Sequence, residues 1–159
     1  MRLRTKNLAD YAQDKAFRTP EAVAIYLENG EHIRFGSIFK EAMALATSLS
    51  NLGLKAGDVI SFQLPNWRET IALDIAAVWL GLLVNPVIPI YRDHELAFIL
   101  ADSRCRCLFI PGVYRGYDFP EMIERLSPEL PDLQHVITVR DDAQREGAAN
   151  TMLRYENLI

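Results

Sequence analysis

The segment GDVISFQLPNWRE at residues 57–69 occupies the position at which many nucleotide-binding α/β proteins hold a phosphate. It reads as a turn, a short apolar stretch ending at Leu64, and the start of a helix. Phosphate binding at such a turn uses glycines, whose backbone N–H groups approach the ligand at the helix N-terminus. Pro65, Asn66 and Trp67 stand there instead, and no lysine follows a glycine as a Walker loop requires. The segment therefore predicts neither kind of phosphate loop.

Three polar features near this segment have structural interpretations. Asn66 is expected to cap the following helix, because a side-chain oxygen at this position accepts a backbone N–H of the first turn. GVYRG at residues 112–116 is interpreted as a loop, because it lacks the lysine and the helix start that would hold phosphate. Asp74 lies in an apolar helical stretch, and we expect it to be half-buried beside an arginine or a backbone donor, since an isolated buried charge is costly.

Metal and nucleophile chemistry have few candidate residues. Cys105 and Cys107 stand two apart in a predicted strand, whose alternation would point both side chains to the same face. His94 and His135 have no ligand-like spacing to them, and a structural zinc site needs about four ligands. We interpret both cysteines as buried core residues. No Ser/His/Asp arrangement can be assembled, so the local chemistry predicts no catalytic and no metal-binding residue.

Composition indicates an ordinary globular chain of 159 residues, half of them apolar and 24% charged. The formal net charge of −4 disfavours a nucleic-acid partner. The basic N-terminus has no apolar region behind it, so we expect no secretory signal and a cytoplasmic location. Asp74, Asn85, Pro86 and Pro89 interrupt the most apolar stretch, residues 71–90, which argues against a transmembrane segment.

Periodicity and turn signals predict the N-terminal elements. A helix is expected over residues 5–18, with Leu8, Tyr11 and Ala12 among the residues on its apolar stripe. The Asn29-Gly30 pair between two apolar runs predicts a β-hairpin. A second helix runs from residue 37 and ends at Gly53.

Beyond Gly53 the pattern alternates between strands and helices. Apolar runs predict strands at residues 58–64, 84–88, 106–110 and 134–139. Helical spacing of apolar residues predicts the intervening helices at residues 66–82, 93–102 and 119–127. This alternation predicts an α/β fold, a mostly parallel sheet with helices on both faces, preceded by an N-terminal helix and a β-hairpin. Helix 66–82 is apolar nearly all round, so Ile71, Ile75, Val78 and Trp79 are expected to be inaccessible.

We predict a single domain over residues 1–159. It comprises the helix and hairpin at residues 1–35, an α/β core at residues 36–140, and a connector at residues 141–159 that is polar at first and apolar at its end.

The order of motifs from residue 19 to residue 139 resembles the N-terminal part of the adenylate-forming (AMP-binding) superfamily, which includes acyl-CoA synthetases, aryl-acid ligases and peptide-synthetase adenylation domains. The matching pieces are TPEAVAI, LGLKAGD, QLPN and GLLVNPVIPIY, which are weak singly and specific in this order. The stretch NPVIPIYRDHELAFILADSRCRCLFIPGVYRGYDF is most similar to medium-chain and alicyclic acyl-CoA ligases, with aryl-acid AMP ligases next. YRDHEL stands where peptide-synthetase domains carry an acidic-proline motif, which favours CoA over a carrier protein as acceptor.

The resemblance implies a two-step ligase that uses ATP, Mg²⁺ and CoA as a full-length enzyme. In that family the ATP phosphate loop follows this region and the catalytic lysine lies in a C-terminal domain, so the resemblance implies a truncated N-terminal subdomain that is inactive alone and holds no cofactor. Arg92 matches a family arginine that approaches the phosphates of CoA, a role that suits the planar guanidinium. The alternative for Arg92 is a solvated side chain beside Asp93 and Glu95.

Three interpretations of the chain stay open. It is a fragment of an acyl-CoA synthetase, a fragment of an acyl- or aryl-AMP ligase that loads a carrier protein, or a non-catalytic α/β interaction module. The partners expected under the first interpretation are the missing downstream subdomains of the same enzyme and, through exposed surface, a second copy of the chain.

Overall fold

The centre of the molecule is a five-stranded parallel sheet. The structure is a computed structural model that describes residues 6–141 and 152–159. The strand order is β4-β3-β5-β8-β9, and every pair of neighbours is parallel. The bounds are Val59–Phe62 for β3, Leu83–Pro86 for β4, Cys107–Pro111 for β5, His135–Val139 for β8 and Leu153–Arg154 for β9. The predicted parallel sheet is confirmed.

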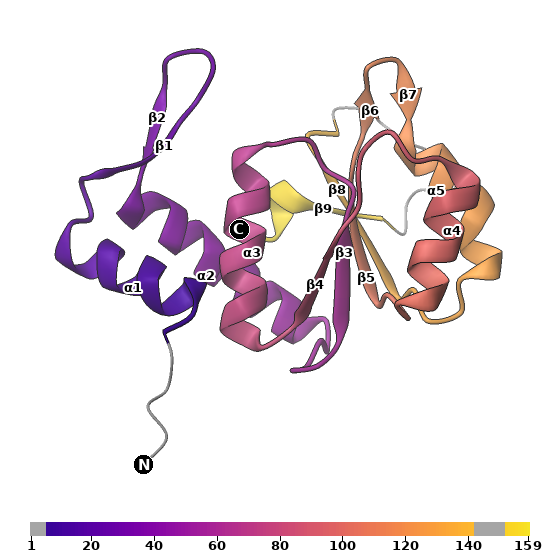
Figure 1. Cartoon of the computed structure of the whole chain (residues 1–159), viewed down its shortest axis with the longest axis horizontal. Coiled ribbons are helices and arrows are strands. Elements are labelled where there is room, and N and C mark those ends of the chain that lie inside the picture. The colour runs from indigo at the N-terminus through magenta and orange to yellow at the C-terminus, as the bar shows by residue number, and fades with distance from the viewer. Residues whose placement is uncertain (1–5, 142–151) are drawn as a thin grey trace.

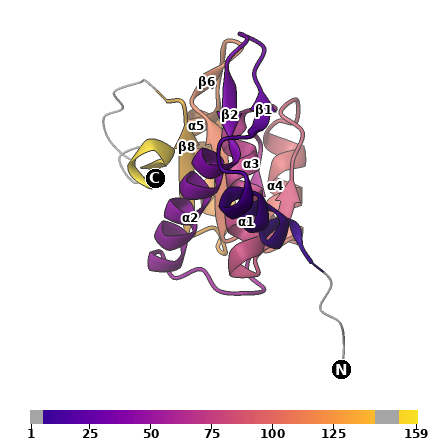
Figure 2. The ribbon, with the colours of Figure 1, turned by 90° about the vertical axis from the view of Figure 1, so that its left-hand side faces the viewer.

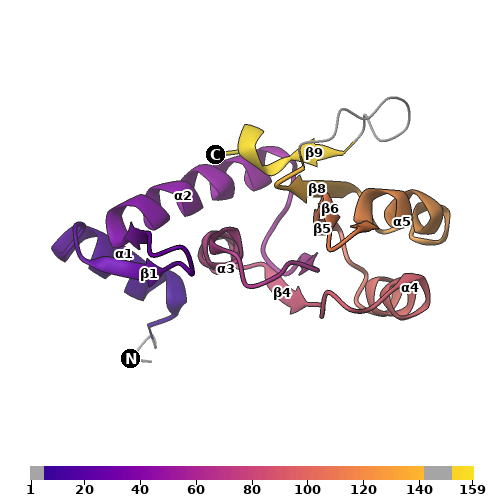
Figure 3. The ribbon, with the colours of Figure 1, turned by 90° about the horizontal axis from the view of Figure 1, so that it is seen from above.

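Helices cover both faces of this sheet, as the alternating pattern predicted (Figures 1 and 3). One face carries α2 (Phe35–Asn51) and α3 (Arg68–Leu80), with α1 (Leu8–Arg18) packed against these two helices, and the other face carries α4 (Asp93–Asp102) and α5 (Phe119–Leu126). Residue 5, at the start of the first predicted helix, lies outside the described residues.

Strand β5 shows why both faces must be covered. Cys107 and Phe109 belong to the core beneath α2 and α3, whereas Leu108 and Ile110 belong to the core beneath α4 and α5. All four side chains are fully buried. A strand buried on both faces is a continuous apolar run rather than an alternating one, which is the pattern of LFI in the sequence.

The predicted hairpin and the predicted end of α2 are confirmed. Strands β1 (Val23–Tyr26) and β2 (His32–Arg34) are antiparallel and project beyond α1 and α2 (Figure 2). Gly30 in their turn has φ +84°, and Gly53 after α2 has φ +88°. Glycine suits both positions because residues with a Cβ atom are strained in the left-handed region.

Two predicted apolar faces are only partly correct, since Ala12 and Ile75 are buried but other residues of each face are exposed. On α1 the buried residues are Ala9 and Ala12, whereas Leu8 and Tyr11 are 47% and 58% exposed. Small alanine side chains let α1 pack against its neighbouring helices, and this packing decides which side of α1 is buried. On α3, Ile71 and Trp79 are 39% and 44% exposed.

The exposure of Ile71 and Trp79 follows from the position of α3. Its inner side covers the sheet with Ala72, Leu73 and Ala76, which are fully buried, so its outer side reaches solvent. Ile75 is buried, as predicted, whereas Val78 is only half-buried and not inaccessible as expected. Trp79 retains one aromatic partner, the edge-to-face ring of Phe39 at 6.0 Å.

Asp74 is half-buried on the same helix, and burial raises the pKa of its carboxyl. The expected arginine or backbone donor is not there, because among the described residues Asp74 has no hydrogen-bond or ion-pair partner. The partial burial of this turn of α3 therefore disfavours the ionised form of Asp74.

The two cysteines are buried, as predicted, but they do not share a face. Cys105 precedes β5 and belongs to the core beneath α4 and α5, whereas Cys107 belongs to the opposite core. The chain bends at Arg104, whose φ is +50°, so strand alternation does not extend back to Cys105. Burial raises the pKa of both thiols, which keeps them protonated.

Residues 152–159, within the expected connector, add to the main core. Strand β9 pairs with β8, and Tyr155 in the 3₁₀ turn η3 (Tyr155–Asn157) is only 2% exposed. Ser48 donates a hydrogen bond to the carbonyl of Leu158 at 2.6 Å. Residues 142–151 of the expected connector lie outside the described residues.

Within the described parts of the chain, no helix combines the length and the apolar character that crossing a membrane requires.

Replacing Tyr155 with alanine is expected to lower the free energy of unfolding by about 3–5 kcal/mol, because a large buried ring is removed from the core. Ile159→Ala, at a residue 46% exposed, is the matched control and should cost less than about 1 kcal/mol. Urea denaturation measures both. Equal losses in the two variants would show that residues 152–159 are not part of the cooperative core.

Asp74→Asn is expected to raise the free energy of unfolding at pH 7, by no more than about 1 kcal/mol because the site is half exposed to solvent. A carboxyl with a raised folded-state pKa destabilises the fold once it is ionised, so the gain should vanish as the pH falls below its unfolded pKa of about 3.9. Denaturation at several pH values measures this. A pH-independent gain, or the same profile in the exposed control Asp132→Asn, would contradict it.

Candidate functional site

The carboxyl ends of the strands form the candidate site. The chain runs from β3 through α3 to β4 on one side, then through α4 back across to β5 on the other side of β3. Ligands of open α/β sheets bind where the connections diverge in this way. We call the segments that leave the strands here, residues 63–68, 87–92, 112–118 and 140–141, the carboxyl edge.

The turn after β3 places Trp67, rather than a glycine, at the start of α3. Trp67 is the N-cap residue in extended conformation, and no side chain caps the helix. The predicted capping role of Asn66 is therefore wrong, because α3 begins at Arg68 and Asn66 lies one residue too early and is exposed. The hydroxyl of Thr70 donates to the carbonyl of Pro65 at 3.2 Å and ties the turn to the helix.

Arg92, the candidate binding residue, lies at the start of α4 on this edge. Its Nη1 donates to the carbonyls of Pro89 and Tyr91, both at 2.8 Å. Its guanidinium lies over the ring of Tyr117 at 4.1 Å and near that of Phe119 at 5.6 Å. Neither nearby carboxylate pairs with the guanidinium; Glu95 accepts only the backbone N–H of Arg92. The guanidinium is therefore held by backbone carbonyls and an aromatic ring, and not by Asp93 or Glu95.

A second hairpin that sequence patterns missed supports Arg92. Strands β6 (Val113–Tyr114) and β7 (Tyr117–Asp118) enclose a tight turn at Arg115 and Gly116, whose φ values are +51° and +75°. A turn with two such residues is the two-residue hairpin type, for which Arg-Gly is a weaker sequence signal than Asn-Gly. The hairpin brings the ring of Tyr117 beneath the guanidinium of Arg92.

Asp93 fixes the same hairpin against α5. Arg125 donates to both carboxylate oxygens of Asp93, at 3.1 and 3.3 Å, and the Tyr117 hydroxyl donates to one of them at 3.3 Å. The Arg125 hydrogen bonds lower the pKa of Asp93. Burial raises the pKa of Tyr117, and the nearby Asp93 carboxylate raises it further. Tyr117 is therefore a hydrogen-bond donor at neutral pH, not a base.

An ion pair occupies the other half of the carboxyl edge. Arg140, directly after β8, donates to both oxygens of Glu69 at 3.0 and 2.9 Å. Its guanidinium lies over the Trp67 ring at 4.4 Å, and Tyr114 contacts that ring edge-on at 5.6 Å. Glu69 is buried, and the backbone of Arg140 lies in the left-handed region with φ +55°. The pairing joins residues 71 apart in the chain, and no local pattern predicts it.

The ion pair continues into the core through Glu41 of α2. Arg68 pairs with Glu41 and lies 3.6 Å from Glu69. The Tyr155 hydroxyl donates to Glu41 at 2.8 Å. Burial, together with Glu41, raises the pKa of Tyr155 far above its usual range, so it stays protonated. Every one of these charges has a protein partner, which indicates a structural role for this network.

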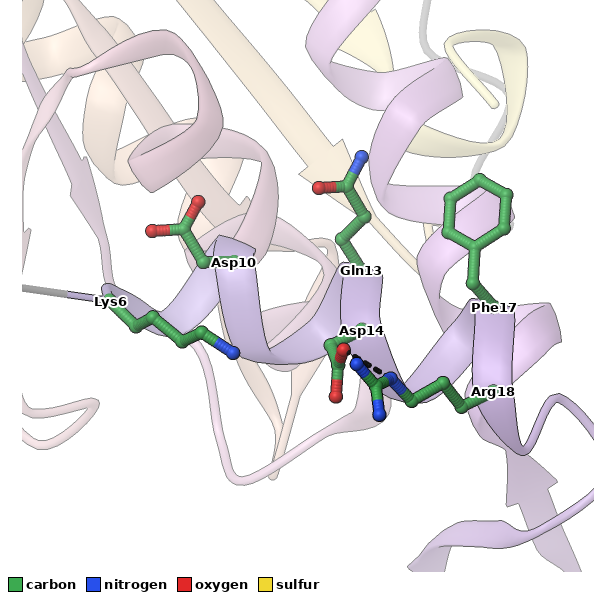
Figure 4. Close-up of a pocket in the computed structure, with 6 residues that line it drawn as sticks. All are labelled: Lys6, Asp10, Gln13, Asp14, Phe17 and Arg18. Atoms are coloured by element: carbon green, nitrogen blue, oxygen red, sulfur yellow. Dashed lines mark ion pairs between the residues drawn. The ribbon is translucent and has the colours of Figure 1, made fainter.

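Other polar groups of the described residues form no second site. Among them, no group of three or more His, Cys, Asp or Glu side chains could hold a metal ion. His32 and His94 are exposed, and His135 contacts the carbonyl of Leu52 at 3.1 Å. A shallow depression on α1 is shown in Figure 4; its lining comes from one helix and its adjoining residue, namely Lys6, Asp10, Gln13, Asp14, Phe17 and Arg18.

Comparisons with known proteins identify the relatives of this chain. The sequence model of the AMP-binding enzyme family matches residues 12–157. The medium-chain fatty-acid–CoA ligase of Escherichia coli is 29% identical over 133 residues, which is 84% of this chain and 24% of that protein. The vibriobactin-specific 2,3-dihydroxybenzoate-AMP ligase of Vibrio cholerae is 30% identical over 132 residues, which is 83% of this chain and 24% of that protein.

A solved structure supports the fold. A provisionally assigned long-chain-fatty-acid CoA ligase from Rhodopseudomonas palustris superposes with a TM-score of 0.82 at 22% identity, over 99% of this chain and 37% of that one. The present chain spans about a quarter of the length of the two curated relatives above.

Proposed function

The chain belongs to the AMP-binding enzyme family, and from this we propose that it forms the N-terminal α/β region of an ATP-dependent acyl-CoA ligase. In the proposed reaction a carboxylic acid and ATP give an acyl-adenylate and pyrophosphate, and the CoA thiol then displaces AMP. The observation that carries the proposal is the family match over residues 12–157, joined to a relative that is a medium-chain fatty-acid–CoA ligase. A cytoplasmic location, where ATP and CoA are available, is part of the proposal.

We propose that residues 1–159 alone do not catalyse this reaction. Adenylation needs donors around the triphosphate, a carboxylate that holds a metal ion and a cation near the leaving pyrophosphate. On the carboxyl edge, Arg140 is committed to Glu69 and the turn after β3 has proline and tryptophan in place of glycines. ATP, Mg²⁺ and CoA are therefore assigned to a longer protein.

The proposed contribution of this chain to ligand binding is Arg92. Its ring contacts and carbonyl contacts hold the guanidinium at the carboxyl edge. A guanidinium so held suits a phosphate group of CoA, because its donors match two phosphate oxygens.

A ligase that transfers the acyl group to a carrier protein is the second candidate. It is favoured by the similarity to the 2,3-dihydroxybenzoate-AMP ligase of Vibrio cholerae. A non-catalytic interaction module is the third. Activity of a longer polypeptide that contains this region would exclude the module, and acyl transfer to CoA rather than to a carrier would separate the two ligases.

We further propose that the isolated chain self-associates through its exposed apolar surface. Leu83 on the edge strand β4 is 57% exposed, and Trp79 and Ile71 lie on the adjoining helix with partly exposed side chains. Sedimentation velocity should show a fraction of dimer that increases with protein concentration, and Leu83→Lys should lower that fraction. A single monomeric species at high concentration would refute this.

The isolated chain is expected neither to bind ATP specifically nor to exchange pyrophosphate into ATP. Scattered arginines attract polyphosphates in a salt-sensitive manner without selecting ATP. Calorimetry with ATP and Mg²⁺, and exchange assays with medium-chain and aromatic acids, test this. Saturable binding in the micromolar range at physiological salt, or acid-dependent exchange, would show that residues 1–159 contain a nucleotide site.

Arg92→Ala is expected to raise the Michaelis constant for CoA roughly tenfold, the cost of a lost hydrogen bond to a charged group. The change is made in a chimaera in which residues 12–157 replace the matching region of the Escherichia coli medium-chain ligase. ATP–pyrophosphate exchange should be nearly unaffected, because the contact is remote from adenylation. The control is Arg18→Ala on α1. Equal loss in both half-reactions would mean that Arg92 is structural.

A further inference from the structure

Gln63 is a buried polar residue at the end of β3. Its side-chain Nε2 donates to the carbonyls of Ile88 at 3.2 Å and Tyr91 at 2.9 Å, and its backbone N–H donates to Phe109 of β5 at 2.8 Å. Its Oε1 is buried with no hydrogen-bond partner among the described residues. An unpaired buried acceptor destabilises a fold, whereas the two hydrogen bonds that Nε2 donates stabilise the turn at Ile88 and Tyr91.

Gln63 and Arg92 hold the same turn from two sides. The Tyr91 carbonyl accepts both Gln63 Nε2 at 2.9 Å and Arg92 Nη1 at 2.8 Å. Tyr91 also closes the turn by donating its N–H to the carbonyl of Ile88 at 3.1 Å. The position of the Tyr91 carbonyl therefore depends on Gln63, and the position of Nη1 depends on that carbonyl.

The contacts of Arg92 leave one side of its guanidinium open. Nη1 is bound to two carbonyls and one face lies on Tyr117. Within the part of the chain that the structure describes, Nε and Nη2 have no protein acceptor. These two nitrogens form the edge that donates two parallel hydrogen bonds to a phosphate or carboxylate.

We propose that Gln63 is a positioning residue for Arg92. By fixing the Ile88 and Tyr91 carbonyls, it orients the guanidinium so that Nη1 is occupied and the Nε–Nη2 edge is presented to a phosphate group. The use of that edge rests on the proposed contact between Arg92 and CoA, whereas the orientation itself is a property of the ligand-free chain. The two parts are therefore separable by experiment.

The orientation is tested on the chain of residues 1–159 labelled with ¹⁵N-arginine. The ring of Tyr117 should displace the Nε–H resonance of Arg92 from its position in the urea-unfolded chain. Gln63→Met, which keeps the side-chain size and removes both donors, should abolish at least half of that displacement. The control Ser61→Ala changes a buried polar residue of the same strand, whose partner is Asn85 rather than the turn, and should leave the resonance unchanged. An unchanged Arg92 resonance in Gln63→Met overturns the proposal.

If Gln63→Met does not fold, hydrogen exchange in the unmodified chain provides the test. The side-chain amide protons of Gln63 should exchange with water at least tenfold more slowly than those of Gln134, which is exposed. Equal exchange rates would show that Gln63 does not hold the two carbonyls, and would overturn the proposal.

The ligand is tested separately with CoA, and with inorganic phosphate to distinguish a nucleotide from the free anion. In the chimaera that carries residues 12–157, CoA should shift the Arg92 Nε–H resonance saturably, and Gln63→Met should weaken that response at least threefold. A response to CoA of the same size in Gln63→Met would overturn the positioning role. No response of the otherwise unmodified chimaera to CoA, with the ligand-free displacement still dependent on Gln63, would overturn the CoA contact and support the orientation.

Discussion

The two-sided burial of β5 constrains the rest of the molecule. A parallel strand with Cys107 and Phe109 on one face and Leu108 and Ile110 on the other requires helices above and below it. The chain meets this requirement by crossing from α3 on one face to α4 on the other. This crossing creates the divergence at the carboxyl ends of β3 and β5. The location of the candidate site is thus a consequence of how the core is covered.

The carboxyl edge is built from charge pairs and aromatic rings. Arg140 pairs with Glu69 over Trp67, and Arg92 lies on Tyr117 with its Nη1 on two carbonyls. The two arginines differ in one respect that matters for function. The guanidinium of Arg140 pairs with a buried carboxylate, whereas that of Arg92 has no acidic partner among the described residues and retains an open donor edge. Under the proposed function, Arg92 is therefore the one of these two arginines that is available to a phosphate group.

Membership of the AMP-binding family and the architecture of this region are both consistent with the proposed role as part of a longer ligase. A region that spans about a quarter of its curated relatives presents a rigid sheet edge with a held arginine. Behind that edge Glu41 pairs with Arg68 and accepts a hydrogen bond from the Tyr155 hydroxyl. Such an edge is consistent with the proposed role of this region as one part of a longer ligase.

The sequence by itself determined the α/β class, the alternation of the main strands and helices, the hairpin at Asn29-Gly30 and the buried cysteines, because these follow from local periodicity and turn chemistry. It also identified Arg92 as the candidate for ligand contact, through family resemblance. Only the tertiary structure decided which helix faces are buried, since Leu8, Ile71 and Trp79 are exposed by where neighbouring helices pack. It alone revealed the pairing of Glu69 with Arg140, the insertion of Tyr155 and the two donors on the Tyr91 carbonyl. These contacts join residues far apart in the chain, and no local pattern encodes which distant residues will meet.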